Sequence, residues 1–329
     1  MRRLVVLLVV ALGIAPGTWV RSPAPQNDTR QILTVTGLEL PAIALGPLEL
    51  TGAWELDSPN RRFGSYSGLV ALDGATLLAA SDYGTMLLFP MPGEQGRPRI
   101  ASFPGTDARP TYQRDLEALT RDATGRIWGA YEMMNRIERY DAELSTVDVA
   151  SPQAMRDWPS NAGPEGMVRL ADGRFIVLAE GPLRWFGDET QGLLFPADPV
   201  DGAAPLPFRF VAGEGFRPVD MAQLPDGRVL ILLRKVAWGL PPGFAGKLVV
   251  ADPATIREGA PWHAQPVAIL AEPLPSENYE GIAVESDGRG GSVVWLISDD
   301  NNSNLQRTLL LRLAWRANEK ARDNGRAPE

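Results

Sequence analysis

Four acidic residues open similar short segments of this chain, and their type and spacing suit metal binding. The segments begin at Glu117, Glu165, Asp220 and Glu280, and Ser67 begins a fifth of the same pattern. In each segment a small or apolar residue and a short apolar run follow, which is typical of a β-strand. Where such strands converge, their carboxylates repel one another and raise each other's pKa unless a cation lies between them.

Carboxylate oxygens in this number suit Ca²⁺, which binds about six to eight oxygen atoms. We therefore expect Ca²⁺ as the cofactor. The expected metal ligands are Glu117, Glu165, Asp220, Glu280 and Asp299. Glu132 and Glu180 each follow a lead residue by 15 positions and could lie close by. A structural alternative stays open, in which each carboxylate binds backbone amides of a neighbouring segment or pairs with an arginine.

Two basic residues stand where the other segments carry acids. Arg234 and Lys235 end the second apolar run of the fourth segment. Beside a metal ion, such cations can bind the phosphate or carboxylate group of a substrate. Ordinary ion pairing with the acidic residues is the alternative. The residues expected to act in catalysis are Glu165, Glu280, Arg234 and Lys235.

The spacing of the five segments predicts the elements that position these residues. The lead residues are 50, 48, 55 and 60 positions apart, and Asp-Gly or Asp-x-x-Gly turns follow four of them. A hairpin repeat of this length is typical of a β-propeller with one unit per blade, so we expect an all-β fold. The repeat length favours five blades and leaves six open. Residues 48–56 alternate like a strand and are expected to pair with the C-terminal strand, closing the ring.

Composition and the chain ends narrow the function classes. There are 40 acidic and 32 basic residues, a net charge of −8, which argues against nucleic acid as a partner. Cysteine is absent and there is one histidine, which excludes thiol catalysis and sites with several imidazoles. Residues 1–22 are expected to be a signal peptide or an N-terminal anchor of a periplasmic or secreted protein. One domain is expected over residues 30–316, followed by a loose charged tail at 317–329. We expect a monomer.

Several motifs in order resemble the phytase-like domain family, whose members are described as having the esterase-like activity of phytase. The matching motifs are FGSYSGL at 63–69, SDYG at 81–84, DLEAL at 115–119, PEG at 164–166, EGI at 280–282, ISDDN at 297–301 and QRTLL at 306–310. The resemblance covers residues 46–315 and implies hydrolysis of a phosphoester or ester. A more distant likeness is to β-propeller phytases and calcium-dependent lactonases, which hold Ca²⁺ at a carboxylate-lined channel mouth.

Three hypotheses follow for the function. The first is an exported, calcium-dependent hydrolase that acts on a small anionic phosphoester or ester at the channel mouth. The second, from another class, is a non-catalytic periplasmic propeller that binds a sugar, a peptide or an envelope partner. The third is a calcium-dependent lactonase. Turnover of an ester by the purified protein separates the enzymes from the binding protein.

Overall fold

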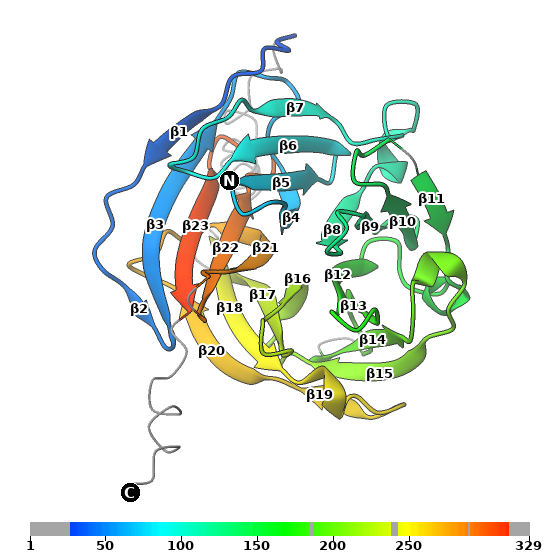
Figure 1. Cartoon of the computed structure of the whole chain (residues 1–329). Helices are drawn as coiled ribbons and strands as arrows, with labels where there is room; N and C mark the ends of the chain where they lie inside the picture. Colours follow the sequence, from blue (N-terminus) through cyan, green and yellow to red (C-terminus); the bar gives the residue numbers. More distant parts are fainter. Residues whose placement is uncertain (1–26, 146, 185–186, 238–242, 289, 316–329) are drawn as a thin grey trace, which may run out of the picture.

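Five β-sheets, antiparallel except for one parallel edge strand, form a ring around a central channel in the computed structural model of the chain (Figure 1). The structure describes residues 27–315, apart from 146, 185–186, 238–242 and 289. The all-β propeller is confirmed, and the described residues form five blades. The expected signal segment and the expected tail lie outside the described residues. In the described part of the chain, no helix is long and apolar enough to cross a membrane.

Each blade is one sheet whose innermost strand lines the channel (Figure 1). Blade one contains β4 (Tyr66–Ala71), β5 (Thr76–Ser81), β6 (Thr85–Pro90) and β7 (Arg99–Ser102), and blade two contains β8 (Leu116–Arg121), β9 (Ile127–Tyr131), β10 (Arg136–Tyr140) and β11 (Val147–Ala150). Blade three contains β12 (Pro164–Arg169), β13 (Phe175–Pro182), β14 (Glu189–Phe195), β15 (Leu206–Val211) and β19 (Pro261–His263). Blade four contains β16 (Arg217–Gln223), β17 (Val229–Ala237), β18 (Gly243–Ala251) and β20 (Gln265–Leu270). Blade five contains β21 (Asn278–Ser286), β22 (Ser292–Asp299), β23 (Thr308–Trp315), β3 (Leu48–Asp57), β1 (Thr34–Gly37) and β2 (Ala44–Leu45).

The ring is closed by strands from the two ends of the chain. In blade five, β3 pairs with β23 in antiparallel register from Thr308 opposite Leu56 to Trp315 opposite Leu48. β1 then pairs with the outer edge of β3. The predicted closure is therefore confirmed. Because strands from the two ends of the chain share the sheet of blade five, the ring cannot open without breaking these hydrogen bonds.

Short polar turns join the first two strands of each blade. In blade three, Gly173 has a φ of +92°, a conformation that glycine adopts without steric cost. The carboxylate of Asp172 accepts a hydrogen bond from the backbone N–H of Arg174 at 3.1 Å. The turns at Asp122 and Asp226 have the same kind of bond. The repeated Asp-Gly signal thus marks real hairpin turns, all on one face of the propeller.

A β-bulge at the start of every inner strand sets where the lead side chains point. The residues left out of the strand pairing are Ser67, Glu117, Glu165, Val219 and Glu280. A bulge re-aims a side chain by adding one residue opposite its partner strand. Blade four therefore differs from the predicted alignment, because its bulged residue is Val219. Asp220 lies one position further along the channel.

The inner strands lie so close together just beyond the bulges that the positions there hold small residues. A Cβ atom at Gly281 would lie 2.6 Å from Cγ2 of Ile297 and 3.0 Å from Cβ of Leu69. A Cβ atom at Gly68 would lie 3.1 Å from the backbone nitrogen of Leu119. Between the blades, large side chains fill the core, including Trp128, Trp262 and Trp295. Those three side chains are almost fully buried.

Candidate active site

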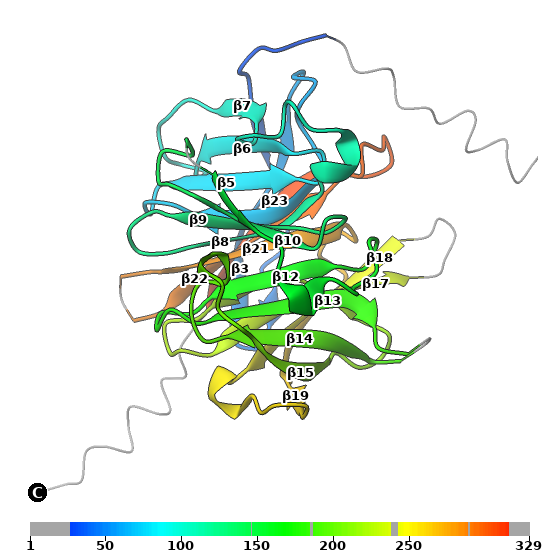
Figure 2. The same ribbon diagram turned by 90° about the vertical axis from the view of Figure 1, so that its right-hand side faces the viewer.

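The bulged residues and the ends of the second strands meet on one face of the propeller, which we call the mouth face. Antiparallel pairing places Tyr66 opposite Ser81 in blade one and Asn278 opposite Asp299 in blade five. The turns after the second strands therefore surround the channel entrance. Figure 2 shows the propeller from the side, with the adjoining ends of β17 and β18 on this face. The Asp-Gly turns lie on the opposite face.

Two groups of three carboxylates meet at the channel entrance. Asp115, Glu117 and Glu132 form one group, and Glu132, Glu165 and Glu180 form the other; within each group, one oxygen from every residue lies within 4.8 Å of the others. Glu132 belongs to both groups. They lie on blades two and three, so the strongest concentration of acid is on one side of the channel.

Burial and mutual repulsion raise the pKa values of these carboxyl groups. Burial first, and then the charge of Asp115, raises the pKa of Glu132 to about 8. The pKa values of Glu117 and Glu165 also lie well above their usual range, because both groups are buried and face other carboxylates. Glu165 forms no hydrogen bond or ion pair with any residue that the structure describes, although its side chain is buried. A buried carboxylate without such a partner is unfavourable unless it is protonated or binds a cation.

Arg234, from blade four, forms ion pairs with carboxylates of blades three and five. Its guanidinium lies 3.0 Å from Oε1 of Glu180 and 2.5 Å from Oε1 of Glu280. It also donates a hydrogen bond to Oδ1 of Asn278 at 3.0 Å. Glu280 accepts further hydrogen bonds from Asn278 at 2.9 Å and from Ser67 at 3.2 Å. Glu280 is therefore paired with protein groups and lies in neither of the two carboxylate groups.

A cavity of about 630 Å³ opens next to the second carboxylate group. Glu180 and Arg234 line it together with Arg217 and Lys235. Lys235 lies with Nζ 4.3 Å from the ring centre of Phe216. The cavity thus places three cationic side chains beside carboxylates that could hold a metal ion.

Two further acids complete the entrance on the side of blades one and five. Burial, followed by the charge of Asp299, raises the pKa of Asp82 to about 8, and Oδ1 of Asp82 is buried with no hydrogen-bond partner in the described part of the chain. Burial and the charge of Glu280 raise the pKa of Asp299 to about 7. Asp299 accepts a hydrogen bond from the backbone N–H of Asn301 at 2.7 Å. Neither acid belongs to the two carboxylate groups.

Asp220 has a structural position inside the channel. Its carboxylate accepts hydrogen bonds from the backbone N–H groups of Met221 and Ile282, at 2.8 and 2.9 Å, and interacts with the backbone N–H of Leu69. It therefore connects inner strands of blades four, five and one. Asp220 therefore lies apart from the two carboxylate groups, because the bulge in blade four falls one residue earlier; that it binds metal stays a prediction.

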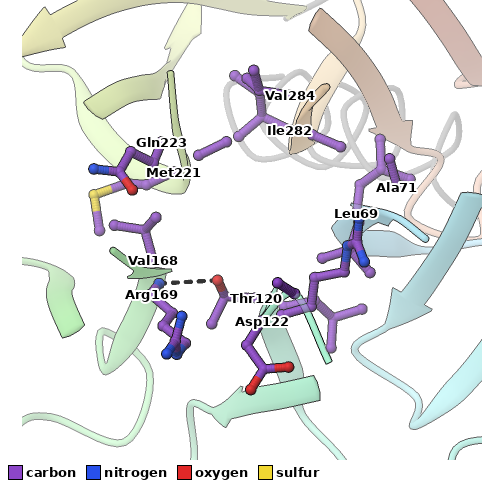
Figure 3. A pocket seen from close by; sticks show the side chains of 16 residues that line it. Leu69, Ala71, Thr120, Asp122, Val168, Arg169, Met221, Gln223, Ile282 and Val284 are labelled. Atoms are coloured by element: carbon purple, nitrogen blue, oxygen red, sulfur yellow. Dashed lines mark hydrogen bonds between the residues drawn. The ribbon is translucent and has the colours of Figure 1, made fainter. Parts of the chain in front are cut away.

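Below Asp220 the channel widens into a second pocket on the opposite face (Figure 3). Its volume is about 230 Å³. Leu69, Val168, Met221 and Ile282 contribute apolar side chains to its wall, and Thr120 accepts a hydrogen bond from the backbone of the third blade at 2.9 Å. The layer that contains Asp220 separates this pocket, whose wall also includes Arg169 and Gln223, from the acidic entrance.

The structure brings together part of the predicted site. Glu117 and Glu165 lie in the carboxylate groups, and Glu280 and Arg234 form an ion pair beside them. Glu132 and Glu180, expected only to lie close by, are members of the groups. Asp115 was not among the predicted ligands, although its place two residues before Glu117 is a signal that sequence reasoning could have used. Whether these residues bind metal or act in catalysis stays a prediction.

Comparisons with known proteins place the chain in a family. The profile of the phytase-like family, described as having the esterase-like activity of phytase, matches residues 61–302. No curated protein matches the chain. Among solved structures, a PQQ-bound aldose sugar dehydrogenase from Streptomyces coelicolor is 14% identical with a TM-score of 0.45, covering 87% of this chain and 99% of that one.

Two further structures are similar at the same level. A streptogramin B lyase is 11% identical with a TM-score of 0.41, covering 86% of this chain and 97% of that one. A putative gluconolactonase is 9% identical with a TM-score of 0.43, covering 78% and 91%. Likenesses this distant carry no conclusion about activity. The family match covers most of the chain, and the chain therefore belongs to the phytase-like family.

Proposed function

We propose that this protein is a metal-dependent hydrolase of anionic phosphoesters or carboxylic esters, with Ca²⁺ as its cofactor. The observation that carries the proposal is the pair of carboxylate groups around Glu132, which adjoin a cavity lined by Arg217, Arg234 and Lys235. The description of the family supports an ester-hydrolysing activity. Export to the periplasm or outside the cell, and a monomeric state, are parts of the same proposal.

The donor set fits a hard divalent cation. All members of the two groups offer carboxylate oxygen, which is the ligand type that Ca²⁺ prefers. The buried Glu165 has no hydrogen-bond or ion-pair partner among the described residues, and its pKa is raised by burial and by its acidic neighbours. Asp115, Glu117, Glu132, Glu165 and Glu180 are the residues that would hold the ion. A bound cation would supply polarisation of the ester oxygen and activation of water.

The basic cavity gives the site its preference for an anionic group. Arg234 is held in place by Glu180 and Glu280, so its position is fixed before a substrate arrives. Arg217 and Lys235 line the same cavity and can bind a phosphate or carboxylate oxygen.

The test is turnover by purified protein. A panel of an aryl phosphate, an aryl carboxylic ester and a lactone is assayed with Ca²⁺ and with excess chelator. We expect hydrolysis of at least one ester that depends on Ca²⁺, and loss of at least a hundredfold in kcat for Glu165→Gln, on the order of a lost catalytic group. Glu94→Gln, a change in an exposed loop, is the matched control and keeps full activity.

Each alternative has its own result in this assay. If no member of the panel is hydrolysed, the enzyme reading fails in favour of a non-catalytic binding protein. If only the lactone is hydrolysed, the lactonase alternative replaces the ester hydrolase. If the unaltered protein shows Ca²⁺-dependent hydrolysis and Glu165→Gln has the same turnover, the second carboxylate group is not the reaction site.

A further inference from the structure

The two faces of the propeller differ sharply in their exposed apolar side chains. On the mouth face, the turn after the second strand of every blade carries or adjoins at least one large apolar side chain that is exposed. These side chains are Tyr83, Met133, Met134, Leu183, Val236 and Leu305, and we call them the apolar rim. Leu305 is the most exposed of them, at 74%.

On the opposite face, five turns join the first and second strands of the blades, and their surface is polar. Each contains an aspartate, and in three of them that aspartate forms an ion pair with an arginine two or four residues later. Within the described residues, none of these five turns exposes a large apolar side chain. The other exposed large apolar side chains lie in or near outer strands, apart from Tyr112, which is also on the mouth face. The apolar rim is thus specific to one face.

A basic cavity adjoins the apolar rim at Tyr83. It has a volume of about 670 Å³ and is lined by Arg61, Arg62, Arg114 and Tyr83, with Asp107 as its one acidic member. The side chain of Arg61 makes no hydrogen bond or ion pair with any residue in the described part of the chain. Arg62 donates a hydrogen bond to Ser102 at 3.1 Å and lies 3.7 Å from the Asp107 carboxylate. The cavity therefore keeps an excess of positive charge and is separate from the proposed reaction site.

Most carboxylates of the site lie deeper than this outer surface, and only Asp115 and Glu180 are half-buried. Glu117, Glu165 and Glu280 are buried in the channel, whereas the apolar rim and Arg61 are exposed. Apolar side chains mixed with arginine are the groups that enter the interface of a membrane with anionic lipids. The apolar side chains stand on separate turns around the channel, and a fluid lipid surface accommodates separate anchors without a matching rigid shape.

We propose that the mouth face docks on a lipid surface that carries anionic head groups. The apolar rim enters the interface, and the cavity of Arg61, Arg62 and Arg114 receives a head-group anion. Docking of this kind leaves the channel entrance facing the lipid surface. The proposal does not depend on the proposed hydrolytic activity, because none of these residues belongs to the carboxylate groups.

Single-cysteine labelling tests the proposal, because the chain has no cysteine of its own. An environment-sensitive dye is attached to Leu305→Cys on the mouth face and, in a separate variant, to Ala171→Cys in an exposed turn of the opposite face. Vesicles of phosphatidylcholine with about 30% phosphatidylglycerol provide the anionic surface. We expect a blue shift and quenching by a lipid-phase quencher at position 305 and neither at position 171. The absence of a shift at 305, or equal shifts at both positions, overturns the proposal.

Vesicle sedimentation of the full chain measures the contributions of single side chains. We expect Leu305→Ser to lower the partition coefficient by about tenfold, since an apolar anchor is lost. Val149→Ser is the matched control, because Val149 is 53% exposed but lies on outer strand β11, and it leaves partitioning unchanged. Arg61→Gln lowers partitioning by about fivefold, but only on anionic vesicles. Equal effects of Leu305→Ser and Val149→Ser contradict the proposal. All variants share the same residues 1–26, so this segment contributes equally to each measurement.

Discussion

Glu132 belongs to both carboxylate groups, so neutralising it tests the electrostatics of the site directly. Glu132→Gln keeps the shape of the side chain and an oxygen that can accept the hydrogen bond from the Gly163 N–H, at 3.2 Å in the structure. The substitution removes the negative charge shared by the groups. We therefore expect the metal-free variant to be more stable than the unaltered protein at pH 8.

The size of the effect follows from the raised pKa of Glu132. A rise from 4.5 to about 8, caused first by burial and then by Asp115, corresponds to about 5 kcal/mol at about 1.4 kcal/mol per tenfold change in proton affinity. Screening by solvent at the channel entrance reduces this to about 2–4 kcal/mol. Because the folded pKa is raised, the unaltered protein loses stability as the pH rises from about 4.5 to about 8. At pH 4 the carboxyl group is mostly protonated in both states, and the variant gains little.

Denaturant titrations in excess chelator at pH 4 and pH 8 measure this difference in the free energy of unfolding. Glu94→Gln, in an exposed turn, is the matched control and shows no gain at either pH. Addition of Ca²⁺ at pH 8 stabilises the unaltered protein by about 2.7 kcal/mol at a hundredfold excess over Kd, and the variant by less. The reasoning is refuted if Glu132→Gln is less stable than the unaltered protein at pH 8, or if its gain is the same at both pH values.

Three further substitutions test the positions that the structure assigns. Asp220→Ala leaves the backbone N–H groups of Met221 and Ile282 unpaired inside the channel. We expect it to lower the free energy of unfolding by about 2–6 kcal/mol in a denaturant titration. Gly281→Ala places a Cβ atom 2.6 Å from Ile297 and lowers the melting temperature, at a cost of about 1–3 kcal/mol, seen by calorimetry. Arg234→Gln leaves the carboxylates of Glu180 and Glu280 without their cation and lowers the free energy of unfolding by about 3–5 kcal/mol in a denaturant titration at pH 7. A neutral effect in any of the three contradicts the assigned position.

The repeat could be predicted from the sequence because it depends on interactions between residues that are close together in the chain. Asp-Gly turns such as Asp172-Gly173 and the apolar runs around them need only neighbouring residues to form a hairpin. The spacing of the lead residues then predicts blades, and the alternation of residues 48–56 predicts the closing strand, which is β3. The sequence favoured five blades but left six open. Only the pairing of β3 with β23 shows which strands share the last sheet.

The members of the site were harder to predict, because similar residues occupy different positions relative to the bulges. Asp220 matches the other lead residues in sequence, yet the bulge in its blade falls at Val219 and leaves its carboxylate bonded to backbone amides. Glu280 has the same bulged position as Glu165 but is paired with Arg234 from the neighbouring blade. Those partners are distant in the chain, so no local pattern reveals them.

The sequence by itself determined the all-β repeat, the hairpin turns and the set of acids that face a common axis, since each follows from residues close together in the chain. Only the tertiary structure decided which acids form the two carboxylate groups. A one-residue change in bulge position moves a carboxylate along the channel, and an arginine from the next blade can neutralise another. Electrostatic interactions act through space between blades, so the repeat placed Glu132 and Glu180 nearby, but only the geometry of the ring joined them with Asp115 in two groups.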